Sequence, residues 1–252
     1  MPSRIHRPVL LAALALVAGA PVRAQIPEEF TNLKVLSPDI EQRKLIGIMR
    51  GFASALGVRC IHCHVGESAD SLEGMDFASD EKQAKETARV MMRMTSEIND
   101  KLLPQIGKES PRQVRCVTCH RQLNKPETLD DVLTTALDRG GVEDVVEDYR
   151  ELRKLYYGQG VYDFSPGPLS RIAETLARER DDVDGALAVM ALNVELHPGV
   201  ANNHAMIGRL HLEGGDKEAA IAAFERALEL EPDNRWARRQ LEMLRQAPPP
   251  SE

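Results

Sequence analysis

Four cysteines could do chemistry in this chain, and they form two pairs with two residues between the members. They are Cys60, Cys63, Cys116 and Cys119. A histidine, His64 or His120, follows each pair directly, so both sites read Cys-x-x-Cys-His. This spacing is the attachment signature of c-type haem, because two thioethers reach the vinyl groups on one porphyrin edge and the next residue brings an imidazole to the iron. The sequence therefore predicts two covalently bound haem c groups, with these histidines as iron ligands.

Other uses of four cysteines explain this pattern less well. Structural disulfides would leave both following histidines without a role. A four-cysteine zinc site would have to join two halves across a long segment, and it too would leave the histidines unexplained. A thioredoxin-like redox pair would need a strand–helix–strand context, for which the surrounding sequence has no strand pattern. Val-Arg precedes both motifs, which indicates a duplicated haem-binding unit.

An electron-transfer haem needs a second axial ligand, methionine or histidine, and methionine gives the higher reduction potential. Residues 37–56 predict a helix that could supply one. Ser37-Pro38-Asp39 is typical of a helix start, apolar residues recur at spacings of three and four, and Gly57 is placed to end the helix. Met49 lies on the apolar face and is the only candidate ligand there. The alternative is a methionine that fills a gap in the core.

A second helix is predicted from Ser79 to about Leu103, before Pro104. Its expected apolar face consists of Ala84, Ala88, Met91, Thr95, Ile98 and Leu102. Met91, Met92 and Met94 crowd one turn of it, and periodicity alone does not choose among them as ligands. The polar segment 66–78 between the two helices is expected to be a surface loop.

The segment from about Pro38 to Lys125 resembles the photosynthetic reaction-centre cytochrome c subunit family, whose haem units each consist of a Met-bearing helix, a turn and a Cys-x-x-Cys-His loop. Met49, with Cys60 eleven residues after it, resembles one such unit, and MMRMTSEIN at 91–99 followed by CVTCHR resembles another. The family's ligand there is the methionine directly before threonine. The resemblance therefore implies Met94 as the sixth ligand of the second haem, with Met91 in reserve. Because the family's subunit carries four haems, this chain resembles a shortened, soluble dihaem relative.

Residues 1–24 have the organisation of a secretory signal peptide, with a basic start, an apolar run of twelve and small residues at the cleavage position. The run is shorter than the roughly 20 residues that span a membrane. We therefore expect a periplasmic protein with no transmembrane span after cleavage. The chain has 32 Lys and Arg against 39 Asp and Glu, a net charge of −7, which argues against nucleic-acid binding. Aromatic residues make up only 4%, which indicates that a large planar cofactor contributes apolar bulk.

The C-terminal half contains an internal repeat. Residues 186–198 match residues 220–232 at an offset of 34 residues, the tetratricopeptide (TPR) period, and Gly208 and Phe224 stand at the small and aromatic positions. Flanking helices near 142–155 and 235–244 are expected to extend the stack, with Trp236 closing it. The expected organisation is a signal peptide (1–24), a dihaem cytochrome c domain (25–127), a helical linker (128–165), TPR-like repeats (166–247) and a disordered tail (248–252).

These observations predict an all-α protein, a dihaem c-type cytochrome domain followed by a short TPR-like domain. Iron closed by His64 with Met49, and by His120 with Met94, has no open coordination position. This arrangement favours one-electron transfer over bond chemistry, with the repeats docking redox partner proteins or peptides. The alternative is a dihaem peroxidase-like enzyme, or a haem redox sensor, with one open or labile iron site. No residue stands out as the distal acid or base that such an enzyme needs.

Overall fold

The computed structural model describes residues 26–27, 29–106 and 112–246. The predicted signal peptide and the predicted disordered tail lie outside these residues. The described chain is helical, with a single isolated bridge between Val65 and Asp76 and no longer strand. This confirms the all-α prediction. No helix within the described ranges is long and apolar enough to cross a membrane.

The chain divides into two compact units, which are described separately here. The first contains the residues up to Gly47 and Arg59–Gln105, and the second contains Ile48–Val58 and the residues from Ile106 onward. Helix α1 (Gln42–Leu56) crosses this division. We call residues 26–127 the cytochrome region and residues 129–246 the repeat region.

Helix α1 begins later than its sequence predicts. Ser37-Pro38-Asp39 forms a turn, in which the backbone N–H of Ile40 donates to the carbonyl of Ser37 at 3.2 Å, and the helix starts at Gln42. Serine, proline and aspartate are favoured in turns as well as at helix starts, so the same residues served the turn. The predicted end is confirmed, since Gly57 follows the helix with φ +66°.

The first unit also contains η1 (Cys60–His62), α2 (Gln83–Glu97), the π-helical turn η2 (Ile98–Leu102) and the 3-10 turn η3 (Leu103–Ile106). The expected start of α2 near Ser79 is wrong by about one turn. Asp76 Oδ1 accepts hydrogen bonds from the backbone of Ala78 and Ser79, both at 2.9 Å, and so closes a turn before the helix. The segment 66–78 is a loop, as predicted.

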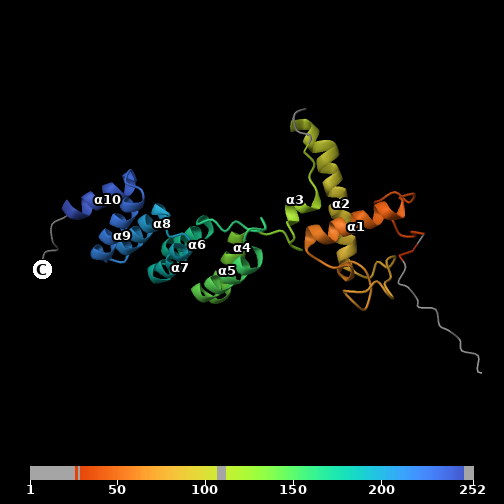
Figure 1. Ribbon diagram of the computed structural model, residues 1–252, viewed down its shortest axis with the longest axis horizontal. Coiled ribbons are helices and arrows are strands. Elements are labelled where there is room, and N and C mark those ends of the chain that lie inside the picture. The colour runs from red at the N-terminus through yellow and green to blue at the C-terminus, as the bar shows by residue number, and fades with distance from the viewer. Residues whose placement is uncertain (1–25, 28, 107–111, 247–252) are drawn as a thin grey trace, which may run out of the picture. The chain divides into compact units, whose positions relative to one another are not determined.

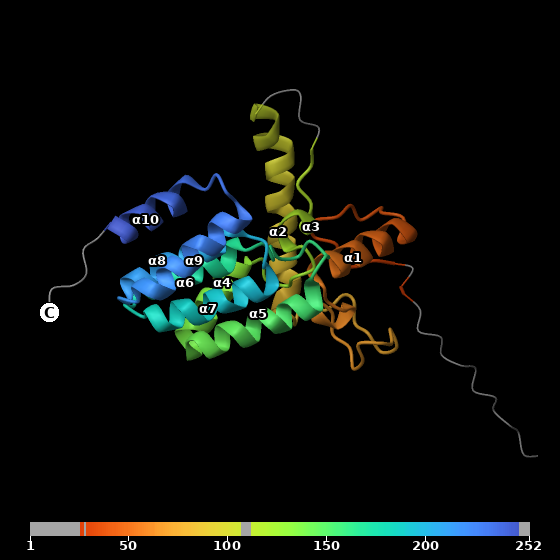
Figure 2. The same cartoon turned by 60° about the vertical axis from the view of Figure 1, so that its left-hand side comes forward.

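The second unit continues with α3 and then seven helices. Their bounds are α3 (Cys116–His120), α4 (Leu129–Gly140), α5 (Val142–Tyr156), α6 (Gly167–Glu179), α7 (Val183–Leu196), α8 (Ala201–Glu213), α9 (Lys217–Leu230) and α10 (Arg235–Gln246). From α4 onward, the helices pack side by side in hairpins, α4 with α5, α6 with α7 and α8 with α9, and α10 packs on α9 (Figures 1 and 2). Short polar caps start several of them, such as Thr128, whose hydroxyl accepts from the backbone of Asp131 at 3.2 Å.

The hairpins bury two apolar clusters. The larger one runs from α4 to α8 and includes Leu133, Tyr149 and Met190, all fully buried. Helices α4 and α5, in the segment expected to be a linker, are thus part of the same core as the repeats. The smaller cluster joins α8, α9 and α10 around Phe224. The Trp236 ring packs against Phe224 in a T-shaped pair at 5.4 Å, in the closing position expected of it.

Candidate functional site: two cysteine–histidine loops

The first loop is a single tight helical turn. The backbone N–H of Cys63 donates to the carbonyl of Cys60 at 3.2 Å, and that of His64 donates to the same carbonyl at 3.0 Å. One turn therefore brings together the two cysteines and the histidine, because residues three and four apart are neighbours on a helix. This geometry suits the attachment of one porphyrin edge and the ligation of its iron.

The imidazole of His64 fits the role of an iron ligand. Its Nδ1 atom is buried and has no hydrogen-bond partner among the described residues, and its ring packs edge-on to Phe77 at 5.2 Å. Burial lowers the pKa of His64, and the positive charge of Lys85 lowers it further. The neutral ring that results is the form that binds a metal.

The second loop forms the short helix α3. At its start the backbone N–H of Arg115 donates to Thr118 Oγ1 at 3.0 Å, and it ends at Arg121 in a left-handed conformation (φ 47°). His120 Nδ1 lies 2.9 Å from the carbonyl oxygen of Leu123. Since a carbonyl only accepts, Nδ1 carries the proton and Nε2 keeps a lone pair for iron.

The end of α1 supports this second loop within the second unit. The backbone N–H of Gln122 donates to the carbonyl of Ala55 at 2.9 Å. A Cβ added to Gly57 would collide with the carbonyl oxygen of Gln122. Glycine at 57 therefore serves both the left-handed end of α1 and the close approach of the backbone after His120.

All four cysteines are free thiols. Cys60 and Cys119 are exposed, and Cys63 and Cys116 are half-buried. Burial raises the pKa of the Cys63 and Cys116 thiols. Each loop thus offers one exposed and one half-buried sulfur.

The candidate methionine ligands lie on α1 and α2. Met49 is half-buried on α1, whereas Met91 and Met94 on α2 are 39% and 45% exposed. His64 and Met94 belong to the first unit, and His120 and Met49 belong to the second. Each predicted axial pair thus draws its histidine and its methionine from different units, and the pairing stays a prediction.

The apolar side chains of the cytochrome region are mostly not covered by protein. Among its described residues only Leu45 and Ala55 are buried apolar side chains. Several large ones are exposed instead: Leu72, Val90, Met91, Met94, Leu102, Ile106 and Val117. The expected apolar face of α2 is therefore half-buried or exposed rather than a core face. Such a surface fits a large apolar group. The two sets of cysteine sulfurs and histidine nitrogens fit the attachment of that group and the binding of its metal.

The buried residues of α2 were missed by sequence reasoning. Lys85 is 9% exposed and Arg89 is 6% exposed. Arg89 pairs with Asp80 at 2.9 Å, and Lys85 pairs with the same carboxylate at 3.1 Å. The spacing of four residues on one helix face was a possible signal, but charged residues in a helix ordinarily face water.

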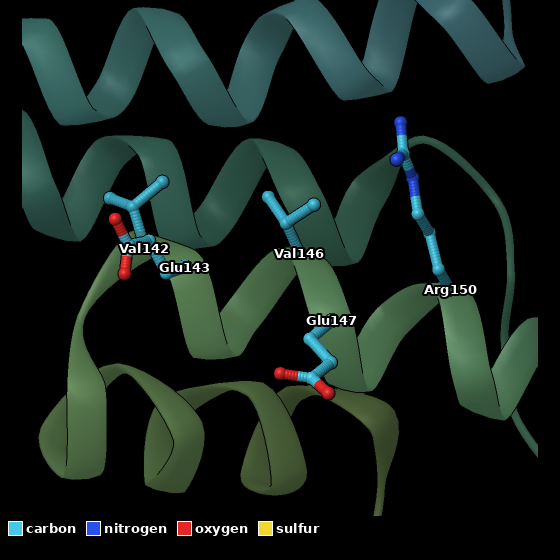
Figure 3. A pocket seen from close by; sticks show the side chains of 5 residues that line it. All are labelled: Val142, Glu143, Val146, Glu147 and Arg150. Carbon is cyan, nitrogen blue, oxygen red and sulfur yellow. The ribbon is translucent and has the colours of Figure 1, made fainter.

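A shallow hollow of about 530 Å³ lies along α5 in the repeat region (Figure 3). Val142, Val146 and Arg150 point to the same side of the helix, and Glu147 points to the other. Arg150 pairs with Glu195 of α7 at 2.8 Å. The lining contains no nucleophile and no histidine, so its chemistry is that of a surface for contact.

Two family models match parts of the chain. Residues 28–138 match the family model described as photosynthetic reaction centre cytochrome C subunit, and residues 201–234 match the tetratricopeptide repeat model. Residues 28–138 are therefore similar to that cytochrome family, for which haem c is the implied cofactor, and residues 201–234 are similar to a tetratricopeptide repeat. No curated protein in the comparison matches the chain.

Solved structures similar to the chain include three TPR domains. The first TPR of Spaghetti (RPAP3), bound to an HSP90 peptide, is 21% identical, and the match covers 47% of this chain and 88% of that one with a TM-score of 0.33. The first TPR domain of human RPAP3 is 20% identical, with coverages of 47% and 87% and a TM-score of 0.33. The Sgt2 TPR domain from Aspergillus fumigatus is 19% identical, with coverages of 49% and 84% and a TM-score of 0.33.

Proposed function

We propose that this protein is a periplasmic dihaem c-type cytochrome that transfers single electrons and docks redox partners through its repeats. The observation that carries the proposal is the pairing of two Cys-x-x-Cys-His turns with a region that buries almost no apolar side chains of its own. A porphyrin held at the first turn would offer apolar surface to the exposed side chains of α2, which lies in the same unit. Covering those side chains would supply hydrophobic stabilisation that the polypeptide lacks.

The chain's own residues hold and orient the two groups. Cys60 and Cys63 form the thioethers of the first, and Cys116 and Cys119 form those of the second. His64 and His120 ligate the two irons, with Met49 and Met94 as their sixth ligands. The carbonyl of Leu123 fixes the ring orientation of His120.

Haem iron supplies a one-electron couple when it is bound in this way. His64 with Met49, and His120 with Met94, would hold the two irons and would leave neither with a free coordination position. Such ligand sets would suit an electron carrier better than an enzyme.

The repeat region supplies the surface for partners. Tetratricopeptide stacks present extended helical faces for peptides or proteins. Leu155, Tyr157, Trp236 and Met243 remain exposed on this region. Exposed aromatic and methionine side chains are typical of protein interfaces.

The haem count is tested on the full chain, exported and matured with haem. Pyridine haemochrome absorbance should give two haems per chain. The double variant Cys60→Ser/Cys63→Ser should retain one haem per chain. The matched double variant Cys116→Ser/Cys119→Ser should also retain one. A wild-type count of one or none contradicts the proposal. Export is checked on the same material, which should be recovered from the periplasm with residue 25 as its first.

The axial ligands are tested by single substitutions. Met49→Ala and Met94→Ala should each abolish one methionine-to-iron charge-transfer band at the red end of the oxidised spectrum. Met91→Ala, one turn from Met94, serves as the control and should keep both bands. Retention of both bands in all three variants means that other residues are the ligands. Rapid binding of carbon monoxide to one haem of the reduced wild type would favour the open-site enzyme or sensor instead.

A further inference from the structure

Lys85 and Arg89 are the only charged side chains that are buried in the described part of the chain. Lys85 Nζ donates to the carbonyls of Phe77, Ala78 and Ser79 at 3.0, 2.9 and 2.7 Å. Burying a charge costs free energy even when the charge is paired. A buried lysine at this place therefore points to a use for its charge.

These charges lie beside the first cysteine loop. Phe77, whose carbonyl accepts from Lys85, packs its ring on His64 at 5.2 Å. Lys82, near the start of α2, donates to the carbonyl of Ile61 inside the loop itself.

Opposite charges only partly cancel this field. The ion-pair network beside the loop joins three cations, Lys34, Lys85 and Arg89, to two carboxylates, Asp80 and Glu86. Within this network the cations outnumber the carboxylates by one. Lys85 is also the cation that water screens least after Arg89, because it is 9% exposed.

Among the described residues, no buried cation lies beside the second loop. Arg115 and Arg121 flank it, but the first is exposed and the second is half-buried. The polar contact of its histidine is with a neutral carbonyl, that of Leu123. Solvent weakens the effect of exposed charges far more than that of buried ones.

We propose that Lys85, aided by Lys82, raises the reduction potential of the haem at Cys60–His64 above that of the haem at Cys116–His120. A nearby positive charge favours the ferrous form, because the ferric form carries one more positive charge. The haem held by Cys60, Cys63 and His64 would then be the one that is reduced at the higher potential. Lys85 would act through the electric field of its buried charge and not as an iron ligand. This inference rests on the proposed dihaem function.

The test is a redox titration of the matured full chain followed by NMR. Wild type should give two one-electron waves, and the first haem is identified by the contacts of its ligand His64 with the Phe77 ring. Lys85→Gln should weaken the reduction equilibrium of that haem about tenfold, which lowers its reduction potential by ~59 mV for one electron. The potential of the haem at Cys116–His120 should not change. Lys85→Arg keeps the charge and should keep the potential. Lys101→Gln removes a charge that is 70% exposed and serves as the control.

Asp80→Asn reverses the sign of the test, because it removes a negative charge and should raise the same potential. A purely structural role of the network would not give opposite shifts in these two variants. If the Lys85→Gln variant does not mature with haem, Lys82→Gln replaces it in the test. A smaller fall in the reduction potential of the first haem is expected for that variant. The inference is overturned if these substitutions leave both potentials unchanged, or if Lys85→Arg falls as far as Lys85→Gln. A wild type without two waves would instead overturn the dihaem function.

Discussion

The cytochrome region and the repeat region are both helical, yet they bury their apolar side chains to very different extents. In the described cytochrome region only Leu45 and Ala55 are buried apolar residues, whereas the repeat region has buried side chains on every helix from α4 to α10. The larger aromatic residues follow the same division, since every tyrosine and the tryptophan lie after residue 148, whereas three of the five phenylalanines lie in the cytochrome region. Helix formation alone therefore does not make a core. The repeats build theirs from side chains, and under the proposed function a bound haem completes the core of the cytochrome region.

The largest expected effect follows from removing the means of attachment. A chain carrying serine at all four cysteine positions should bind no haem covalently, and α1 to α3 should lose the protection of their amides from hydrogen exchange. Helices α6 to α9 should keep theirs, because their core is made of protein side chains. Exchange measured by mass spectrometry gives both results in one sample. Full protection of α2 in the haem-free chain would mean that the two regions do not differ in this way.

The converse experiment damages the repeat core. Phe224 is fully buried, so Phe224→Ala should destabilise the repeat region by about 3–5 kcal/mol. Denaturant unfolding followed by circular dichroism measures this, and the haem absorbance should stay unchanged. Trp236→Ala is the matched control, because Trp236 is 43% exposed and packs on the same ring, so its loss should cost less. If the two substitutions lowered the free energy of unfolding equally, Phe224 would not be the centre of the smaller apolar cluster.

A smaller effect is expected where α1 meets the second loop. Gly57→Ala forces a side chain into a left-handed backbone position and against the carbonyl of Gln122, which should cost about 1–3 kcal/mol. Thermal unfolding followed at the haem absorbance measures the loss. Gly51→Ala, within α1 and with open space around it, should instead stabilise by about 0.5–1 kcal/mol. A stabilising Gly57→Ala would contradict the close approach.

The difference between the regions also explains what the sequence could predict. Cys-x-x-Cys-His motifs and a 34-residue repeat are local patterns, so the two loops and the stacked helices follow from them directly. The starts of α1 and α2 were placed too early, because Ser37 and Ser79 form turns rather than caps. Lys85 was missed because helical periodicity assigns charged residues to the solvent side. Its burial depends on carbonyls of the loop 77–79, and no spacing along α2 reveals that contact.

The smallest effect concerns acid stability of the cytochrome region. Hydrogen bonds from Lys34, and also from Lys85 and Arg89, hold the pKa of Asp80 well below its usual range. A carboxyl with a lowered pKa contributes stability above its unfolded pKa of about 3.9, and this contribution is lost as the pH falls towards the folded value. The haem-absorbance melting temperature should therefore fall between about pH 5 and about pH 2.

Asp80→Asn should be less stable than wild type near neutral pH and should flatten this fall. Asp100→Asn, an exposed aspartate in η2, should reproduce the wild-type curve and is the control. The effect is small because Lys34 and Asp80 are 51% and 31% exposed, so solvent screens their pair. The repeat region makes a useful internal reference, because Asp80 and its partners all lie in the first unit. An equal acid shift in the two regions would assign the loss to general charge repulsion instead of to this network.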